Sequence, residues 1–270
     1  MSVSESLRTE AAALLADGRV TMIIASRRRG HDCVPGFFTN ADQLDALDHD
    51  PDQQLNPAAY LRKEEIRRQM PVAVVARPAV IRSIVLLAAE SQITDDDVVI
   101  LGVDGQTFHG VLDLAAAAAL LKAQYPDLGP DDDVLARVDE LNAMSAEERA
   151  AFWAEQFAKC TRCYACRAAC PACYCTRCIV ERNTPQWIST AALEHGNYAW
   201  NVIRAFHLAG RCTACGACEA ACPQGIPLML LNACVGRTVE AEFDAKVGYD
   251  PEAEPVIGAW REEDKEEYIR

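Results

Sequence analysis

Cysteine is the residue type that could do chemistry in this chain of 270 residues. It holds 13 cysteines, and 11 of them lie between Cys160 and Cys222. Eight of these form two runs with the same spacing, C-x2-C-x2-C-x3-C-P. The first run comprises Cys160, Cys163, Cys166, Cys170 and Pro171, and the second comprises Cys212, Cys215, Cys218, Cys222 and Pro223. An odd number of cysteines gathered in one segment is typical of metal ligands in a reducing compartment rather than of a disulfide scaffold.

The spacing of each run suits a [4Fe-4S] cluster. Three closely spaced thiolates wrap three irons of a cubane, and the fourth cysteine, directed away by the proline, reaches the other cluster. We therefore expect crossed ligation. Cluster 1 is expected to use Cys160, Cys163, Cys166 and Cys222, and cluster 2 to use Cys170, Cys212, Cys215 and Cys218. Zinc is the alternative, but zinc sites pair their cysteines as two C-x2-C units and have no use for a third thiolate at the same pitch.

Three further cysteines follow the first run directly. They are Cys173, Cys175 and Cys178, in the segment CPACYCTRC. They could hold a third [4Fe-4S] cluster with Cys33 or Cys234 as a distant fourth ligand, or they could leave one iron open to other chemistry. The alternative is that they are packing thiols beside the two clusters. Cys33 and Cys234, taken singly, are more typical of small buried hydrophobic residues.

Charge is distributed unevenly along the chain. The formal net charge is −14, which argues against binding to nucleic acid or to an anionic lipid surface. The stretch from Lys159 to Arg211 is the exception, because it carries only two acidic residues, Glu181 and Glu194. Its basic residues are Lys159, Arg162, Arg167, Arg177, Arg182, Arg204 and Arg211. Because a cubane with four thiolates is an anion, we interpret these cations as charge compensation, with a basic surface patch as the alternative.

Residues 1–135 are predicted to form an α/β domain with a small parallel sheet. Helical patterns at 4–18, 57–70 and 77–92 alternate with short apolar strands at 20–26, 72–76 and within 95–105. Pro78 falls in the first turn of its helix, where a missing N–H costs least. The basic residues Arg27 to Arg29 are expected in an exit loop. No G-x-G-x-x-G follows a strand, so 102–110 is interpreted as a turn after a strand, with a phosphate-binding loop as the alternative.

The rest of the chain is predicted to be mainly α-helical. Residues 136–158 are interpreted as a solvated helical connector, in which Ser145 caps a helix. Residues 159–250 are expected to form a ferredoxin-like domain with two clusters held between helices, because Trp200, Ile203 and His207 recur at helical spacing. His195 and His207 are interpreted as helix-face or core residues rather than ligands. Residues 251–270 are expected to be an acidic tail.

Two absences bear on where the protein works. No apolar run is long enough to span a membrane, and the first residues lack the order of a secretory signal. We therefore expect a cytoplasmic protein with no direct membrane span.

The cysteine-rich segment also resembles a known family. Residues 159–188, KCTRCYACRAACPACYCTRCIVERNTPQWI, and 208–228, LAGRCTACGACEAACPQGIPL, are similar to the iron-sulfur part of the beta subunits of coenzyme factor-420 (deazaflavin) hydrogenases and dehydrogenases, including formate dehydrogenases. Residues 71–105 resemble the N-terminal domain of that family. The family usually places cysteines where this chain has Pro78 and Ala79 and, after the third strand, Asp104. The resemblance therefore implies a docking scaffold rather than a redox site in the first domain.

The resemblance implies an electron-transfer subunit of a hetero-oligomeric redox complex. Its partners would be other redox subunits of a hydrogenase, a formate dehydrogenase or a heterodisulfide-reductase-like assembly. No nucleophile with an adjacent base and no paired carboxylates form a recognisable catalytic site. The alternative is a flavin-dependent subunit that reduces a deazaflavin or other small acceptor, although no residue pattern supports FAD. A purely structural or oxygen-sensing role for the clusters is a third interpretation.

Overall fold

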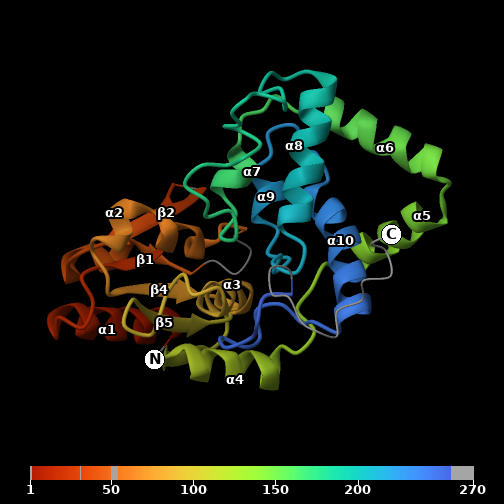
Figure 1. The fold of residues 1–270 in the computed structure, drawn as a ribbon. Helices are drawn as coiled ribbons and strands as arrows, with labels where there is room; N and C mark the ends of the chain where they lie inside the picture. The colour runs from red at the N-terminus through yellow and green to blue at the C-terminus, as the bar shows by residue number, and fades with distance from the viewer. Residues whose placement is uncertain (1, 31, 50–53, 257–270) are drawn as a thin grey trace.

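The first half of the chain folds as a sheet between two helical layers. The computed structural model describes residues 2–30, 32–49 and 54–256 (Figure 1). The strands are β1 (Ile23–Arg29), β2 (Asp32–Phe38), β3 (Leu47–Asp48), β4 (Val72–Ala76), β5 (Val98–Val103) and β6 (Phe108–Leu112). The helical elements of this half are α1 (Val3–Ala16), the 3-10 helices η1 (Ala41–Ala46) and η2 (Pro57–Arg62), α2 (Glu64–Arg67), α3 (Pro78–Ala89) and α4 (Leu114–Gln124).

The sheet is mixed rather than purely parallel. Its strand order is β2-β1-β4-β5-β6, and β3 pairs with β1 beside this path. The three inner strands β1, β4 and β5 are parallel, as the alternation of strands and helices predicts. The edge strands β2 and β6 run antiparallel to their neighbours. The predicted α/β domain is therefore confirmed in outline, and the expectation of a wholly parallel sheet is wrong because hairpins extend both edges.

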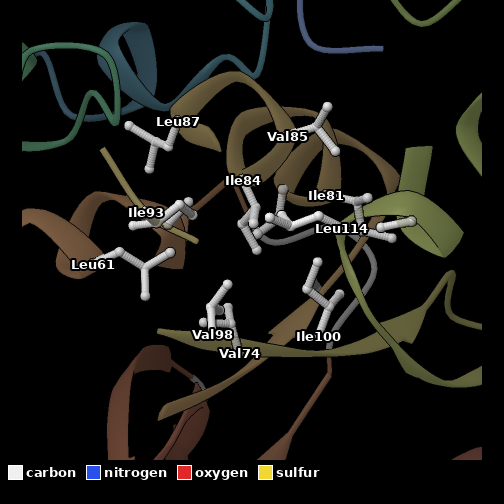
Figure 2. Close-up of a cluster of buried hydrophobic side chains, with 14 of the residues drawn as sticks. Leu61, Val74, Ile81, Ile84, Val85, Leu87, Ile93, Val98, Ile100 and Leu114 are labelled. Carbon is white, nitrogen blue, oxygen red and sulfur yellow. The ribbon is translucent and has the colours of Figure 1, made fainter. Parts of the chain in front are cut away.

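Alternate residues of the inner strands face two separate cores. Val72, Val74 and Ala76 of β4 pack with η2, α3 and α4, whereas Ala73 and Val75 pack on the face covered by α1 and η1. Figure 2 shows the first of these cores, in which α3 side chains lie over those of β4 and β5. Strands buried on both faces read as continuous apolar runs, which is why VAVVA predicted β4 with its observed bounds.

Truncation of a side chain in this core should be costly. Ile84 of α3 is fully buried among strand and helix residues, so Ile84→Ala is expected to reduce the free energy of unfolding by about 2 to 5 kcal/mol, through lost transfer energy and a residual cavity. The graded control Ile84→Val should cost only about 0.5 to 1.5 kcal/mol. Urea denaturation followed by circular dichroism measures both. Equal effects of the two variants would contradict the packing described.

Two segments depart from the predicted elements. Arg27, Arg28 and Arg29 do not form an exit loop, because they continue β1 and pair with β2, a strand that the sequence did not indicate. Residues 57–70 do not form one helix. They divide into η2 and the single turn α2, with Lys63 extended between them. Both differences arise from tertiary packing, which overrides local propensity.

The turn after β5 is closed by its own aspartate. Asp104 Oδ1 accepts hydrogen bonds from the backbone N–H groups of Gln106 and Thr107, and its Oδ2 accepts one from the hydroxyl of Tyr125 at 2.7 Å. Burial works to raise the pKa of Asp104, but these hydrogen bonds outweigh it and lower the pKa to about 2. Because a carboxylate already occupies the loop amides, the structure favours the interpretation of 102–110 as a turn over a phosphate-binding loop.

The second half is helical. Its helices are α5 (Asp132–Ala143), α6 (Ala146–Ala158), α7 (Ala165–Ala168), α8 (Glu194–His207), α9 (Ala217–Ala220) and α10 (Leu228–Phe243). Ser145 caps α6 in a capping box with Glu148, as its sequence predicts. The segment interpreted as a solvated connector is packed instead. Val138 and Leu141 of α5 are buried against Leu230 and Ala233 of α10.

Polar side chains join the two halves at α3. The buried Arg82 donates to the backbone carbonyls of Leu128, Val247 and Thr213. Glu90, at the end of the same helix, forms an ion pair with Arg211, with N–O distances of 2.5 and 2.7 Å. The α/β domain is thus fixed against the cysteine-rich half.

Within the described ranges, no helix combines the length and the apolar character needed to cross a bilayer. The predicted acidic tail lies largely outside the described residues, which end at Val256.

Candidate iron-sulfur centres

The two cysteine runs fold into the same backbone shape. In the first run Arg162 and Tyr164 adopt left-handed conformations, with φ of 57° and 60°. In the second run the corresponding residues Ala214 and Gly216 do so, with φ of 52° and 76°. A single helical turn then follows in each run, α7 and α9. Alternation of left- and right-handed residues is typical of loops whose backbone N–H groups surround an anionic group.

Four cysteines from both runs border the first cavity. Its cysteines are Cys160, Cys163, Cys166 and Cys222. Trp200 and Asn201 of α8 and Ile226 and Leu228 at the start of α10 complete its wall. The fourth cysteine therefore comes from the other run, as the expected crossing requires.

The second cavity has the reciprocal composition. Its cysteines are Cys170, Cys212, Cys215 and Cys218. Leu86 of α3, Leu208, and Met229 and Asn232 of α10 also border it. Asn232 Nδ2 donates to the Sγ of Cys218 at 3.7 Å. Helices from both halves of the chain therefore enclose this cavity.

Both cavities suit a cubane cluster better than a single ion. Among the described residues, no three histidine, cysteine or carboxylate side chains are arranged to hold one metal ion. The thiols instead surround a space, and four soft thiolates per cavity match the ligand demand of a [4Fe-4S] cluster. Such a cluster, when bound, supplies one-electron redox chemistry.

Burial keeps most of the second cavity's thiols neutral. It raises the pKa of Cys212 to about 12 and also raises the pKa values of Cys215 and Cys218. In the first cavity, burial raises the pKa of Cys166. Because a thiol binds iron as the thiolate, cluster assembly at these residues releases protons.

A buried arginine lies between the two sets of thiols. Arg204 of α8 is 4% exposed and donates to the carbonyl of Cys166 at 3.1 Å. Burial works to lower its pKa, but the cysteine side chains of Cys170, Cys173, Cys218 and Cys166 raise it when they are ionised. The guanidinium is therefore a fixed positive charge beside both cavities.

The other basic residues of the segment have different partners. Arg162 is buried and donates to the carbonyls of Ser189 and Gly196, while Arg167 and Arg211 form ion pairs with Glu181 and Glu90. Lys159, Arg177 and Arg182 are exposed. Among these basic residues, Arg204 is thus the buried cation beside both cavities that can compensate the charge of the clusters. The sequence did not distinguish it from its neighbours.

The α/β domain also reaches the second cavity. The buried Asn56 donates to the Oγ of Ser83 at 2.8 Å, and Ser83 Oγ lies 2.8 Å from the hydroxyl of Thr213, which borders the cavity. Asn56 also forms a hydrogen bond with Cys215 that works to lower the pKa of this thiol. No local pattern indicates this contact, because Asn56 and Cys215 are far apart in the chain.

The remaining candidate residues lie in three places. Cys33 is on β2 and its thiol donates to Asp48, whereas Cys234 is on α10, in the core that α10 forms with α5. Neither lies beside Cys173, Cys175 and Cys178, which border a third, larger cavity. His195 is exposed on α8 and borders none of the three cavities, whereas His207 borders the third.

Comparisons with known proteins agree with this geometry. A family model described as a 4Fe-4S dicluster domain matches residues 159–227. The chain is 30% identical over 99 residues to the F420-dependent formate dehydrogenase subunit beta of Methanocaldococcus jannaschii, a match that covers 37% of this chain and 24% of that protein. It is 32% identical over 106 residues to the F420-dependent formate dehydrogenase 1 subunit beta of Methanococcus maripaludis, covering 39% and 27% respectively. The matches span about a quarter of the length of these relatives.

The predicted resemblance to deazaflavin-linked dehydrogenase beta subunits is confirmed over the matched segment. The match to residues 159–227 supports binding of [4Fe-4S] clusters by the cysteine-rich part of the chain.

Proposed function

We propose that this chain, whose cysteine-rich half contains a 4Fe-4S dicluster domain, relays single electrons between partner proteins of a cytoplasmic redox complex. The observation that carries the proposal is the pair of cavities, each of which is bordered by three cysteines of one run and the fourth cysteine of the other. Cysteines 160, 163, 166 and 222 would hold one [4Fe-4S] cluster, and cysteines 170, 212, 215 and 218 the other. Two clusters so closely interleaved exchange electrons rapidly, whereas a purely structural role would need only one.

The names of the matched relatives indicate which partner subunits to expect. Both matched proteins are named as beta subunits of formate dehydrogenases, so a formate dehydrogenase-type assembly is the first expectation for the partner subunits. A hydrogenase or a heterodisulfide-reductase-like assembly would place the same relay beside a different catalytic subunit. In each case residues 1–135 act as the scaffold that docks the relay on its partners. Residues 136–158 connect this scaffold to residues 159–250, which carry the clusters.

The two cavities differ in their access to the surface. Cys163 of the first cavity is exposed, whereas Cys218 of the second is buried and α3 of the α/β domain covers that side. The first cluster would therefore exchange electrons with an external partner, and the second would lie on the inner side of the relay.

Metal analysis and redox titration of the anaerobically purified full chain test the proposal. We expect at least about eight irons with matching acid-labile sulfide, and reversible one-electron reduction of two clusters seen by electron paramagnetic resonance. Four irons or fewer after full reconstitution, stoichiometric zinc in place of the iron, or clusters that cannot be reduced reversibly would refute the relay. Bound flavin together with turnover of a small acceptor by the isolated chain would instead favour the flavin-dependent alternative.

A further inference from the structure

A third cavity lies between α8, the segment after the first cysteine run and the end of α3. Its volume is about 590 Å³, far more than that of the first or the second cavity. The three cysteines that the two runs leave over, Cys173, Cys175 and Cys178, all border it. They come from a segment of six residues with the spacing C-x-C-x2-C. Three thiols are thus placed on one cavity by a short stretch of chain.

Contacts from both halves of the molecule hold this segment in place. Arg167 donates to the carbonyl of Cys175 at 2.7 Å and pairs with Glu181. The ring of Tyr174 lies between the guanidinium groups of Arg62 and Arg211, at 5.1 and 4.7 Å from its centroid. Since Arg62 belongs to the α/β domain, the position of the thiols depends on both halves. The segment is therefore organised before any ligand binds, which a row of packing thiols would not require.

The cavity joins the second cluster site directly. The thiol of Cys173 donates a hydrogen bond to Cys170. Cys170 borders the second cavity. A redox group in the third cavity would therefore lie next to a ligand of the second cluster, and the third cavity also shares the wall residue Trp200 with the first.

The charge around the cavity suits an anionic group. Arg167, Arg204, Arg211 and Glu90 border it. Because Arg167 and Arg211 are already paired with Glu181 and Glu90, Arg204 is the cation there without a carboxylate partner among the described residues. Arg204 is 4% exposed, and its buried Nε has no hydrogen-bond partner among the described residues. An unpartnered, buried donor next to three thiols favours a ligand that brings negative charge, as an iron-sulfur cluster with thiolate ligands does.

A fourth ligand is available on the same cavity. His207, in the last turn of α8, borders the same cavity as the three cysteines, whereas Cys33 and Cys234 do not. Imidazole replaces thiolate at iron in some iron-sulfur clusters. Zinc also accepts three cysteines and one histidine, but it draws its ligands around a point, and no three such side chains in the described part of the chain are arranged around a single ion.

We propose that Cys173, Cys175 and Cys178, with His207 as the fourth ligand, hold a third [4Fe-4S] cluster in this cavity. The inference deepens the proposed relay and rests on it, because it extends the path of two clusters by one. The fourth ligand is then His207, which the sequence predicted to be a helix-face or core residue, in place of the distant Cys33 or Cys234.

Iron analysis of cysteine variants of the full chain tests this site. Anaerobically purified protein should contain about twelve irons, and Cys175→Ser and Cys178→Ser should each reduce this to about eight. Cys33→Ser and Cys234→Ser are the matched controls and should keep all the iron. His207→Ala should change the resonance and the midpoint potential of one cluster only. Retention of the other two cluster signals in each variant shows that the chain has folded.

The outcomes separate this site from the relay. About eight irons in the unmodified chain, with no loss in Cys175→Ser or Cys178→Ser, would overturn the third cluster and leave the relay standing. One zinc per chain that is lost in those variants would replace the cluster with a zinc site. Loss of the third cluster in Cys234→Ser but not in His207→Ala would overturn the assigned fourth ligand. Four irons or fewer in the unmodified chain would refute the relay itself.

Discussion

Replacement of Cys222 by serine is expected to remove the cluster bound by Cys160, Cys163 and Cys166. The cluster bound by Cys212, Cys215 and Cys218, which are closer to Cys222 in sequence, should stay intact. The reason is the crossed arrangement of the cavities, in which Cys222 borders the first and not the second. Loss of one thiolate from a cubane site should cost up to about four irons per chain and one of the two ferredoxin-type resonances. Electron paramagnetic resonance of the reduced protein, together with iron analysis, measures both.

The reciprocal variant is the control for this prediction. Cys170→Ser should perturb the cluster bound by Cys212, Cys215 and Cys218 and spare the other, because Cys170 borders the second cavity. A substitution near the exposed Cys163 should alter the signal of the first cluster alone, which identifies that signal. If Cys222→Ser instead abolished only the cluster of its own run, ligation would be local and the crossed arrangement would be wrong.

The cluster sites could be anticipated because their spacing is local. The first three cysteines of each run lie within seven residues, so their meeting is a local property. The fourth comes from the other run, and it was expected from the crossed ligation of two-cluster ferredoxins. The four cysteines expected for each cluster do border one cavity. Ser145 as a helix cap and Pro78 in a first turn are local features of the same kind, and both are present. Signals of this type depend on residues a few positions apart.

The surroundings of the sites could not be anticipated, because they depend on contacts between distant parts of the chain. The α/β domain was expected to be a docking scaffold without chemistry. In the structure, Leu86 forms part of the wall of the second cavity, and Asn56 bonds to Ser83 and to Cys215. Periodicity places these residues on a helix or in a loop, but it does not say which surface of the other half they will meet.

The edge strands were missed for a related physical reason. A hairpin partner such as β2 carries Gly36 and Pro35, which are poor strand formers, and its pairing with β1 is what makes it a strand. The inner strands need no such support, since burial on both faces makes them continuously apolar. The central strands of the sheet can therefore be predicted from the sequence, whereas the edge strands cannot.

Removal of the positive charge of Arg204 should lower the midpoint potentials of both clusters. Its guanidinium lies beside thiols of both cavities and is almost fully buried, so water screens it little. A unit charge acting over about 8 Å through an effective dielectric constant of about 20 is worth about 2 kcal/mol, which is about 90 mV for a one-electron couple. Arg204→Gln is therefore expected to shift both potentials downward by several tens of millivolts or more. Redox titration followed by electron paramagnetic resonance measures the shift.

Two further variants separate charge from packing in this experiment. Arg204→Lys keeps the charge and should restore most of the potential, although it loses the hydrogen bond to the carbonyl of Cys166. Arg177→Gln removes an exposed arginine of the same segment and should leave both potentials nearly unchanged, because solvent screens an exposed charge. Equal shifts in the lysine and glutamine variants would show that Arg204 acts by holding α8 against the first cysteine run. A shift confined to one cluster would place its charge beside that cluster alone.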